Sequence, residues 1–115
     1  MDDYTVAKTA YEARRAYDKS ACSEELPVFE EAEYWLTASY IKTVEWLKQN
    51  PTATVEDAHN ARNAAVIKAG WKQGPFDPAN KTHPLIVDYA ELPKEQRTRD
   101  AIGFAVMQSL IMGVK

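Results

Sequence analysis

The feature that most limits this fold is the helical spacing of the apolar residues, which is clearest in the first half of the 115-residue chain. Residues 5–21 form the first stretch, where steps of four and three positions place apolar side chains on one side of an amphipathic helix. This stripe consists of Val6, Ala10, Ala13, Tyr17 and Ala21. The charged residues between them are expected to lie mostly on the solvent side, and they are Arg14, Arg15, Asp18 and Lys19.

The second helix should begin near Glu30, because glutamates at positions 30, 31 and 33 favour the positive end of a helix dipole. Its predicted core stripe is Leu36, Tyr40, Val44 and Leu47. The apolar surface is widened beyond one stripe by Tyr34, Trp35, Ile41 and Trp46. A helix that is apolar on more than one side contacts elements on two sides, so this one is expected to be central.

The third helix has clear signals at both ends. Asn50 and Pro51 end the preceding helix, and Thr54 with Asp57 approximates a capping box. Gly70 stands where a left-handed C-terminal cap would fall, so the helix is expected to run to about Ala69.

Residues 70–93 break the helical pattern with two glycines and, before Pro93, three prolines. This stretch also contains the β-prone run 85–87, and it predicts a small hairpin among loops. Pro93 suits the first turn of a last helix running to about Met112, apolar nearly all round and therefore buried or in contact with another subunit. The sequence predicts a mainly α fold: about four helices, with a short β-hairpin or loop element between the third and the last, in one domain spanning residues 1–115.

Charge and cysteine content exclude several classes of protein. The chain has 17 acidic and 14 basic residues, a net charge of -3, and lacks the positive field that draws proteins to nucleic acid or anionic membranes. Cys22 is the only cysteine, no secretory signal is visible, and the most apolar stretch is too short to span a bilayer. A cytoplasmic protein is expected.

Motifs for metal binding and catalysis are lacking. The two histidines, His59 and His83, have no second ligand at zinc-binding spacing. Cys22 lies in a serine-rich loop with no helix start after it to lower its pKa, and phosphate-loop and nucleophile-elbow patterns are missing. No metal, cofactor or catalytic residue is predicted.

The most informative residues lie between positions 59 and 89. His59 and Arg62 fall on one face of the third helix, and the following loop adds aromatic rings and cations. The candidate ligand-binding residues are His59, Arg62, Trp71, Lys81, His83 and Tyr89. Aromatic faces stack on bases, and cations bind phosphates, so the set suits a nucleotide-like ligand. The alternative is that the aromatics fill the core while both histidines bind backbone carbonyls and hold the loop.

The same region resembles the RyR domain, the repeat of ryanodine receptors that also occurs as a single domain in bacterial and bacteriophage proteins. The residues that carry this resemblance are Asn50-Pro51, Thr54, Glu56-Asp57, His59-Asn60, Gly70-Trp71, Gly74-Pro75, Asp77, Lys81, His83-Pro84, Leu85, Val87, Tyr89, Leu92-Pro93 and Asp100. Twelve positions separate the first histidine from the tryptophan, and twelve more lead to the second histidine. With weaker similarity at 7–17 and 27–35, the resemblance covers essentially the whole chain.

The resemblance implies a mostly helical fold with a small strand element and no catalytic activity. Paired receptor repeats look like an adenine-nucleotide binding unit, and single prokaryotic and viral members look like sensors or sequesterers of nucleotide-derived signals. Two departures stand out: Arg62 replaces the tryptophan usual in the family, and only one repeat is present. Arginine still stacks or grips phosphate, and a single repeat would need a homodimer or higher homo-oligomer to complete a shared site.

Three functions follow as hypotheses. The first is a non-enzymatic module for an adenine nucleotide, an ADP-ribose derivative or a cyclic nucleotide signal, such as a viral sequestering protein. The second is a protein-interaction module that uses exposed aromatics of the second helix, namely Tyr34, Trp35, Tyr40 and Trp46. The third is an enzyme that cleaves a nucleotide signal, with His59 and Asp57 or Asp88 in acid-base roles.

Overall fold

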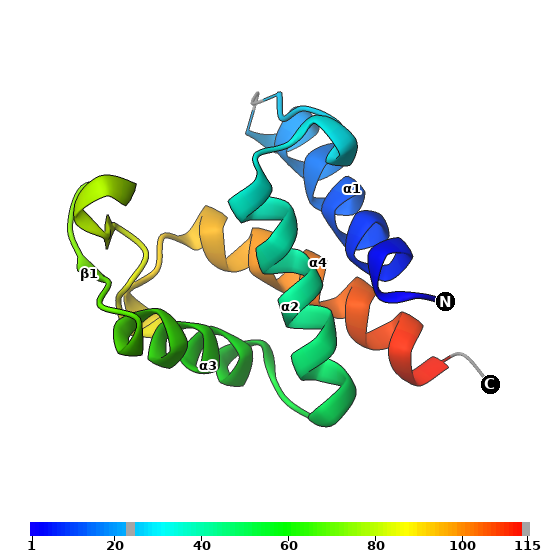
Figure 1. Ribbon diagram of the computed structural model, residues 1–115. Helices are drawn as coiled ribbons and strands as arrows, with labels where there is room; N and C mark the ends of the chain where they lie inside the picture. The colour runs from blue at the N-terminus through cyan, green and yellow to red at the C-terminus, as the bar shows by residue number, and fades with distance from the viewer. Residues whose placement is uncertain (23–24, 114–115) are drawn as a thin grey trace. The chain divides into compact units, whose positions relative to one another are not determined.

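The computed structural model describes residues 1–22 and 25–113, which fall into two compact units. Unit 1 combines residues 1–53 with the chain from Thr98 onward, and unit 2 is the segment Thr54–Arg97 between them. The helices are α1 (Asp3–Ala21), α2 (Tyr34–Gln49), α3 (Val55–Lys68) and α4 (Lys94–Gly113) (Figure 1). A mainly helical fold with four α-helices in the described ranges and a small sheet after the third is therefore confirmed. That the chain is a single domain stays a prediction.

Helix α1 is capped by Asp2, whose carboxylate accepts a hydrogen bond from the Thr5 amide at 2.8 Å. Its buried residues are Val6, Ala7, Ala10, Tyr11 and Asp18. The predicted stripe was thus right at its start and wrong beyond it: Ala21 is exposed, and Asp18 is 0% exposed. The buried face continues along a second stripe of helical spacing, Ala7, Tyr11, Arg14 and Asp18, whose charged members gave it the appearance of a solvent face.

Asp18 is buried because two arginines neutralise it. Its carboxylate accepts hydrogen bonds from Arg14 Nε at 3.3 Å and from Arg99 Nε at 2.7 Å. Arg14 lies on α1 and Arg99 on α4. Burial raises the pKa of the Tyr40 hydroxyl on α2, and the positive charge of Arg14 opposes this rise. A polar cluster thereby joins three helices of unit 1.

Residues 25–31, here named the strap, lie across α1 and end in the 3-10 helix Phe29–Glu31. Tyr11 donates to the Pro27 carbonyl at 2.7 Å, Arg15 donates to the Leu26 carbonyl at 2.8 Å, and the Phe29 amide donates to Glu12 at 3.1 Å. The buried Phe29 ring meets Tyr11 edge-on at a centroid distance of 5.4 Å.

The predicted start of the second helix near Glu30 is therefore wrong. Glu30 belongs to the strap, where it pairs with Lys8, and α2 begins only at Tyr34. A run of glutamates favours a helix start electrostatically, yet burial of Phe29 and the bonds from α1 stabilise the strap conformation more strongly.

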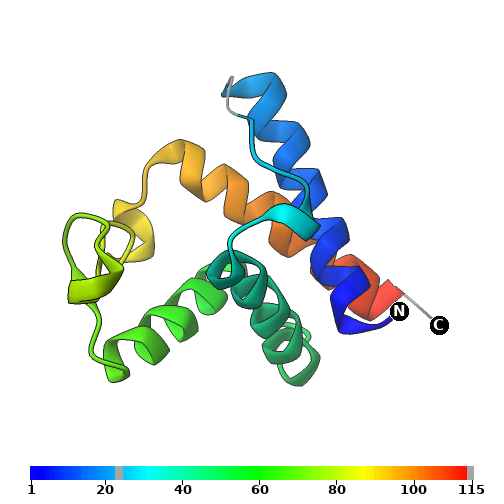
Figure 2. The ribbon, with the colours of Figure 1, turned by 45° about the horizontal axis from the view of Figure 1, so that its top comes forward.

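The core of unit 1 lies between α1, α2 and the part of α4 that belongs to this unit. Val44 and Leu47 on α2 and Phe104 and Met107 on α4 are buried. In both views, the first turns of α1 lie beside the last turns of α4 (Figures 1 and 2). Gln108 donates to the carbonyls of Pro51 and Ala53, both at 2.9 Å, and so holds the end of the segment that follows α2.

Unit 2 is built on α3, and its predicted ends are confirmed. Thr54 and Asp57 form the capping box, with the Thr54 amide bonded to the Asp57 carboxylate at 3.0 Å. At the other end, Gly70 has a φ of 98°, its amide bonds to the Ile67 carbonyl, and the Trp71 amide bonds to Val66. This pair of bonds is a Schellman motif, which satisfies carbonyls that the helix end leaves unpaired.

The small sheet of unit 2 pairs β1 (Lys72–Gln73) with β2 (Thr82–His83) in parallel, so the predicted hairpin is wrong in strand direction. Between the strands the chain forms the 3-10 helix Pro78–Asn80, followed by Lys81 in a left-handed conformation. It turns back along this path, so that β2 runs in the same direction as β1. The β-prone run 85–87 forms no strand, because its polar groups bond to side chains instead: the Leu85 amide to His83 and the Val87 carbonyl to α3.

Candidate functional site

The six residues predicted to bind a ligand all lie in unit 2, where the structure arranges them in three groups rather than around one point. His59 lies with Tyr89, Lys81 lies beside the end of α3 next to Trp71, and Arg62 acts on His83. Each group has its own chemistry, and of the six residues only His59 is buried.

His59 attaches α3 to the loop that follows β2. It is 4% exposed, and its Nε2 lies 2.7 Å from the Val87 carbonyl oxygen. Since a carbonyl only accepts, Nε2 carries the hydrogen, and Asn63 Nδ2 donates to the same oxygen at 2.9 Å. Tyr89, in the 3-10 helix Tyr89–Glu91, meets the imidazole edge-on at a centroid distance of 5.8 Å.

This geometry gives His59 the structural role that the sequence left open as an alternative. Its Nδ1 is buried without a hydrogen-bond partner among the residues that the structure describes. Asn63 was missed by the sequence analysis, although it follows His59 by four positions and therefore lies on the same helix face.

Lys81 also has a structural role. It adopts a left-handed conformation with φ of 55°, and its Nζ donates to the Ala69 carbonyl at 3.0 Å. An ammonium at this place offsets the negative end of the α3 dipole. Trp71, half-buried, directly follows the cap that Lys81 supports.

Arg62 and His83 form the group that faces solvent. Arg62 is exposed on α3, and no hydrogen bond or ion pair of its side chain is seen in the described part of the chain. Burial lowers the pKa of His83, and the positive charge of Arg62 lowers this pKa further. His83 Nδ1 accepts the Leu85 amide at 3.0 Å, so the neutral ring carries its hydrogen on Nε2.

Phe76, which was not among the predicted site residues, completes this group. Its ring is exposed and meets the His83 imidazole edge-on at 5.3 Å between centroids. The sequence signal was its position directly after Gly74 and Pro75, which are typical of a loop. Loops run over the surface, so an aromatic residue there is a candidate for binding rather than for the core. Arg62, His83 and Phe76 are named the cation–aromatic group below.

Metal ligands are not gathered anywhere in residues 1–22 and 25–113, where no three His, Cys, Asp or Glu side chains are placed to share an ion. Over the same ranges, no helix is both long enough and apolar enough to cross a membrane.

Comparison with known protein families gave no match for this chain, and comparison with curated proteins gave none either. The resemblance to the RyR domain accordingly stays a prediction.

Proposed function

We propose that unit 2 binds a nucleotide-derived small molecule without converting it. The observation that carries the proposal is the cation–aromatic group: an exposed guanidinium on α3 acts on a half-buried imidazole, which an exposed phenyl ring contacts edge-on. Guanidinium groups bind phosphates through two parallel hydrogen bonds, and exposed aromatic rings stack on bases.

In this proposal each residue has one role. Arg62 binds a phosphate oxygen, Phe76 stacks on the base, and His83 Nε2 donates a hydrogen bond. Half-buried Trp71 offers a second aromatic face, whereas His59, Lys81 and Tyr89 hold the loop that presents the group. The ligand class is an adenine nucleotide, an ADP-ribose derivative or a cyclic nucleotide.

The proposed biological setting follows the family resemblance. A single-repeat protein of this kind would sequester a nucleotide-derived second messenger in the cytoplasm, for example as a bacteriophage protein acting in its host. Self-association as a homodimer would bring two copies of unit 2 to one ligand.

A thermal-shift panel with ADP-ribose, its cyclic isomers, cyclic mono- and dinucleotides and ATP tests the proposal. A ligand at about 100 times its dissociation constant stabilises a protein by roughly 2.7 kcal/mol, which raises Tm by several degrees. For the compound that shifts Tm, Arg62→Gln should weaken binding about tenfold or more, because it removes a charge-assisted hydrogen bond.

Lys42→Gln is the matched control, since it also removes an exposed cation, in this case from α2. Equal affinities of wild type and Arg62→Gln would refute the assigned site. Chromatography of the same mixtures detects turnover, and any product would favour the enzyme hypothesis.

A second function, protein interaction through aromatic residues of α2, has its own observation. Tyr34 is 84% exposed and Trp35 is 50% exposed at the first turn of this helix. Tyr40 and Trp46 are half-buried, and the Tyr40 ring meets Tyr11 edge-on, so the predicted exposure of these two residues is wrong. The interaction surface is therefore limited to the start of α2.

A further inference from the structure

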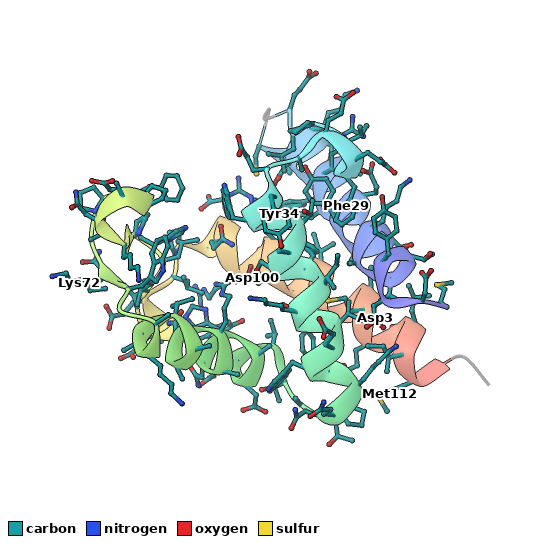
Figure 3. All side chains as sticks on the ribbon, viewed as in Figure 1. Asp3, Phe29, Tyr34, Lys72, Asp100 and Met112 are labelled. Atoms are coloured by element: carbon teal, nitrogen blue, oxygen red, sulfur yellow. The ribbon has the colours of Figure 1, made fainter. Side chains whose placement is uncertain are left out.

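An exposed apolar surface lies where the strap leads into α2. Val28 is 36% exposed, and Tyr34 and Trp35 are the two exposed aromatics of the following helix start. Figure 3 labels Tyr34 at this first turn. Three exposed glutamates lie within three positions of these residues in the chain, namely Glu25, Glu31 and Glu33. We name these six residues the acidic–aromatic face.

The chain segment that carries this face is acidic, and the cations that contact it, Lys8 and Arg15, come from α1. Residues 20–41 contain five glutamates and no lysine or arginine, which is more negative charge than the net -3 of the whole chain. The Lys8 ammonium reaches Glu30 of the strap. The carboxylates of Glu25, Glu31 and Glu33 make no hydrogen bond or ion pair within the residues that the structure describes.

The strap, which carries Glu25, Val28 and Glu31 of this face, is held in one conformation. Three hydrogen bonds from α1 hold its backbone, and the buried Phe29 ring anchors it from below. A surface that is ordered before binding loses little conformational entropy when a partner docks.

We propose that the acidic–aromatic face docks a lysine- or arginine-rich amphipathic peptide segment of a partner protein, an inference that rests on the second function above. Cationic side chains are attracted both to carboxylates and to the faces of Trp and Tyr rings. Apolar side chains of the same segment would cover Val28 and the aromatic rings.

The same charge disfavours the other occupants. A second copy would oppose its own glutamates across a two-fold interface, and like charges there cost affinity. Nucleic acid and anionic membranes carry negative charge and would be repelled.

The test uses the full chain and a fluorescent peptide of about 15 residues with Lys on the polar positions and Leu along one helical face. One control peptide has Glu in place of every Lys, and the other has Ser in place of every Leu. Anisotropy titrations at low and high salt give the dissociation constants.

We expect the Lys/Leu peptide to bind more tightly than either control peptide. Tyr34→Ser with Trp35→Ser should weaken it about tenfold, and Glu31→Gln with Glu33→Gln about threefold or more, with added salt weakening binding further. The matched controls are Ile67→Ser, which removes an exposed apolar side chain, and Glu56→Gln with Glu91→Gln, which removes two exposed charges in unit 2. Circular dichroism verifies that each variant is folded.

Two different failures can be told apart. If the Glu/Leu peptide binds as well as the Lys/Leu peptide and both depend on Tyr34 and Trp35, the face is an interaction surface and the basic partner is wrong. If no peptide depends on these aromatics, or if the control variants weaken binding equally, both the inference and the second function are wrong.

Discussion

Asp18 shows how much a single residue can decide in a chain of this size. A carboxylate that is 0% exposed would be prohibitive alone, and it is tolerated because guanidinium groups approach both of its oxygens, at 3.3 and 2.7 Å. In the native state these two positive charges offset the free-energy cost of removing the carboxylate from water. Loss of the carboxylate charge would remove the counter-charge that both half-buried arginines share.

Asp18→Asn should therefore lower the free energy of unfolding by about 3 to 5 kcal/mol, the range for removing one partner of a buried ion pair. Urea unfolding followed by circular dichroism measures this change. Glu45→Gln, an exposed carboxylate on α2, is the control and should stay within about 0.5 kcal/mol of wild type. A loss of under about 1 kcal/mol for Asp18→Asn would show that the cluster contributes little.

His83 provides a prediction for pH. Burial and then the charge of Arg62 lower its pKa below the ordinary 6.5. Between the folded and the unfolded pKa the unfolded state binds more protons, so this residue lowers stability as the pH falls through about 6.5, and the loss levels off below the folded pKa.

Removal of the neighbouring charge by Arg62→Gln should raise the pKa of His83 towards 6.5, while burial, the larger cause, keeps it below that value. An NMR titration of the imidazole ring protons measures the shift, with Lys42→Gln as the control. An unchanged pKa in Arg62→Gln would mean that the two groups do not interact, and the cation–aromatic group would lose its basis.

At the scale of elements, the glycines of two helices have opposite roles. Gly70 ends α3 with a φ of 98°, which side-chain-bearing residues rarely adopt. Gly103 lies inside α4, where an added Cβ would stand 3.7 Å from the Tyr40 ring, an ordinary contact distance.

The two alanine substitutions should therefore change stability in opposite directions. Gly70→Ala should destabilise the protein by about 1 kcal/mol or more, because the left-handed cap becomes strained. Gly103→Ala should stabilise it by about 0.5 to 1 kcal/mol, because alanine loses less backbone entropy within a helix. Thermal unfolding of both variants measures the difference, and shifts of the same sign would contradict the argument.

Elements with local end signals were predictable from the sequence. Thr54, Asp57 and Gly70 act on neighbouring backbone groups, so their positions alone fixed the limits of α3. The start of α2 was not predictable, because it depends on bonds between the strap and α1, whose partners are up to 26 positions apart. The direction of the β1–β2 pair likewise depends on the path between the strands, which periodicity does not record.

The candidate site was predictable in part for the same reason. The charge of Arg62 on the third helix lowers the pKa of the His83 imidazole in the following loop, and both residues were among those that type and spacing indicated. The hydrogen bonds of Lys81 to the Ala69 carbonyl at the end of α3 and of His59 to the Val87 carbonyl were not predictable from composition. Folding brings each carbonyl close to a side chain that is distant in the sequence.

At the scale of the whole molecule, unit 1 is discontinuous in sequence. Its buried side chains come from residues before position 53 and from α4 after position 98. Phe104, Met107 and the second arginine of Asp18 are all supplied by this last helix.

A chain that ends at Arg97 should therefore lose the cooperative unfolding of unit 1, since buried residues worth about 3 to 5 kcal/mol each would be missing. Circular dichroism during urea unfolding measures cooperativity, with a chain ending at Gly113 as the control. A steep transition at the wild-type urea concentration would show that residues 1–53 fold without α4.

The 81 positions between Asp18 and Arg99 also set an order of events during synthesis. At roughly 5 to 20 residues per second, the ribosome adds the arginine about 4 to 16 s after the carboxylate. Throughout that interval the Asp18 carboxylate of the nascent α1 lacks the arginine that α4 supplies. Unit 1 therefore completes its folding after translation has passed α4, and chaperones that shield unfinished cores have those seconds in which to act.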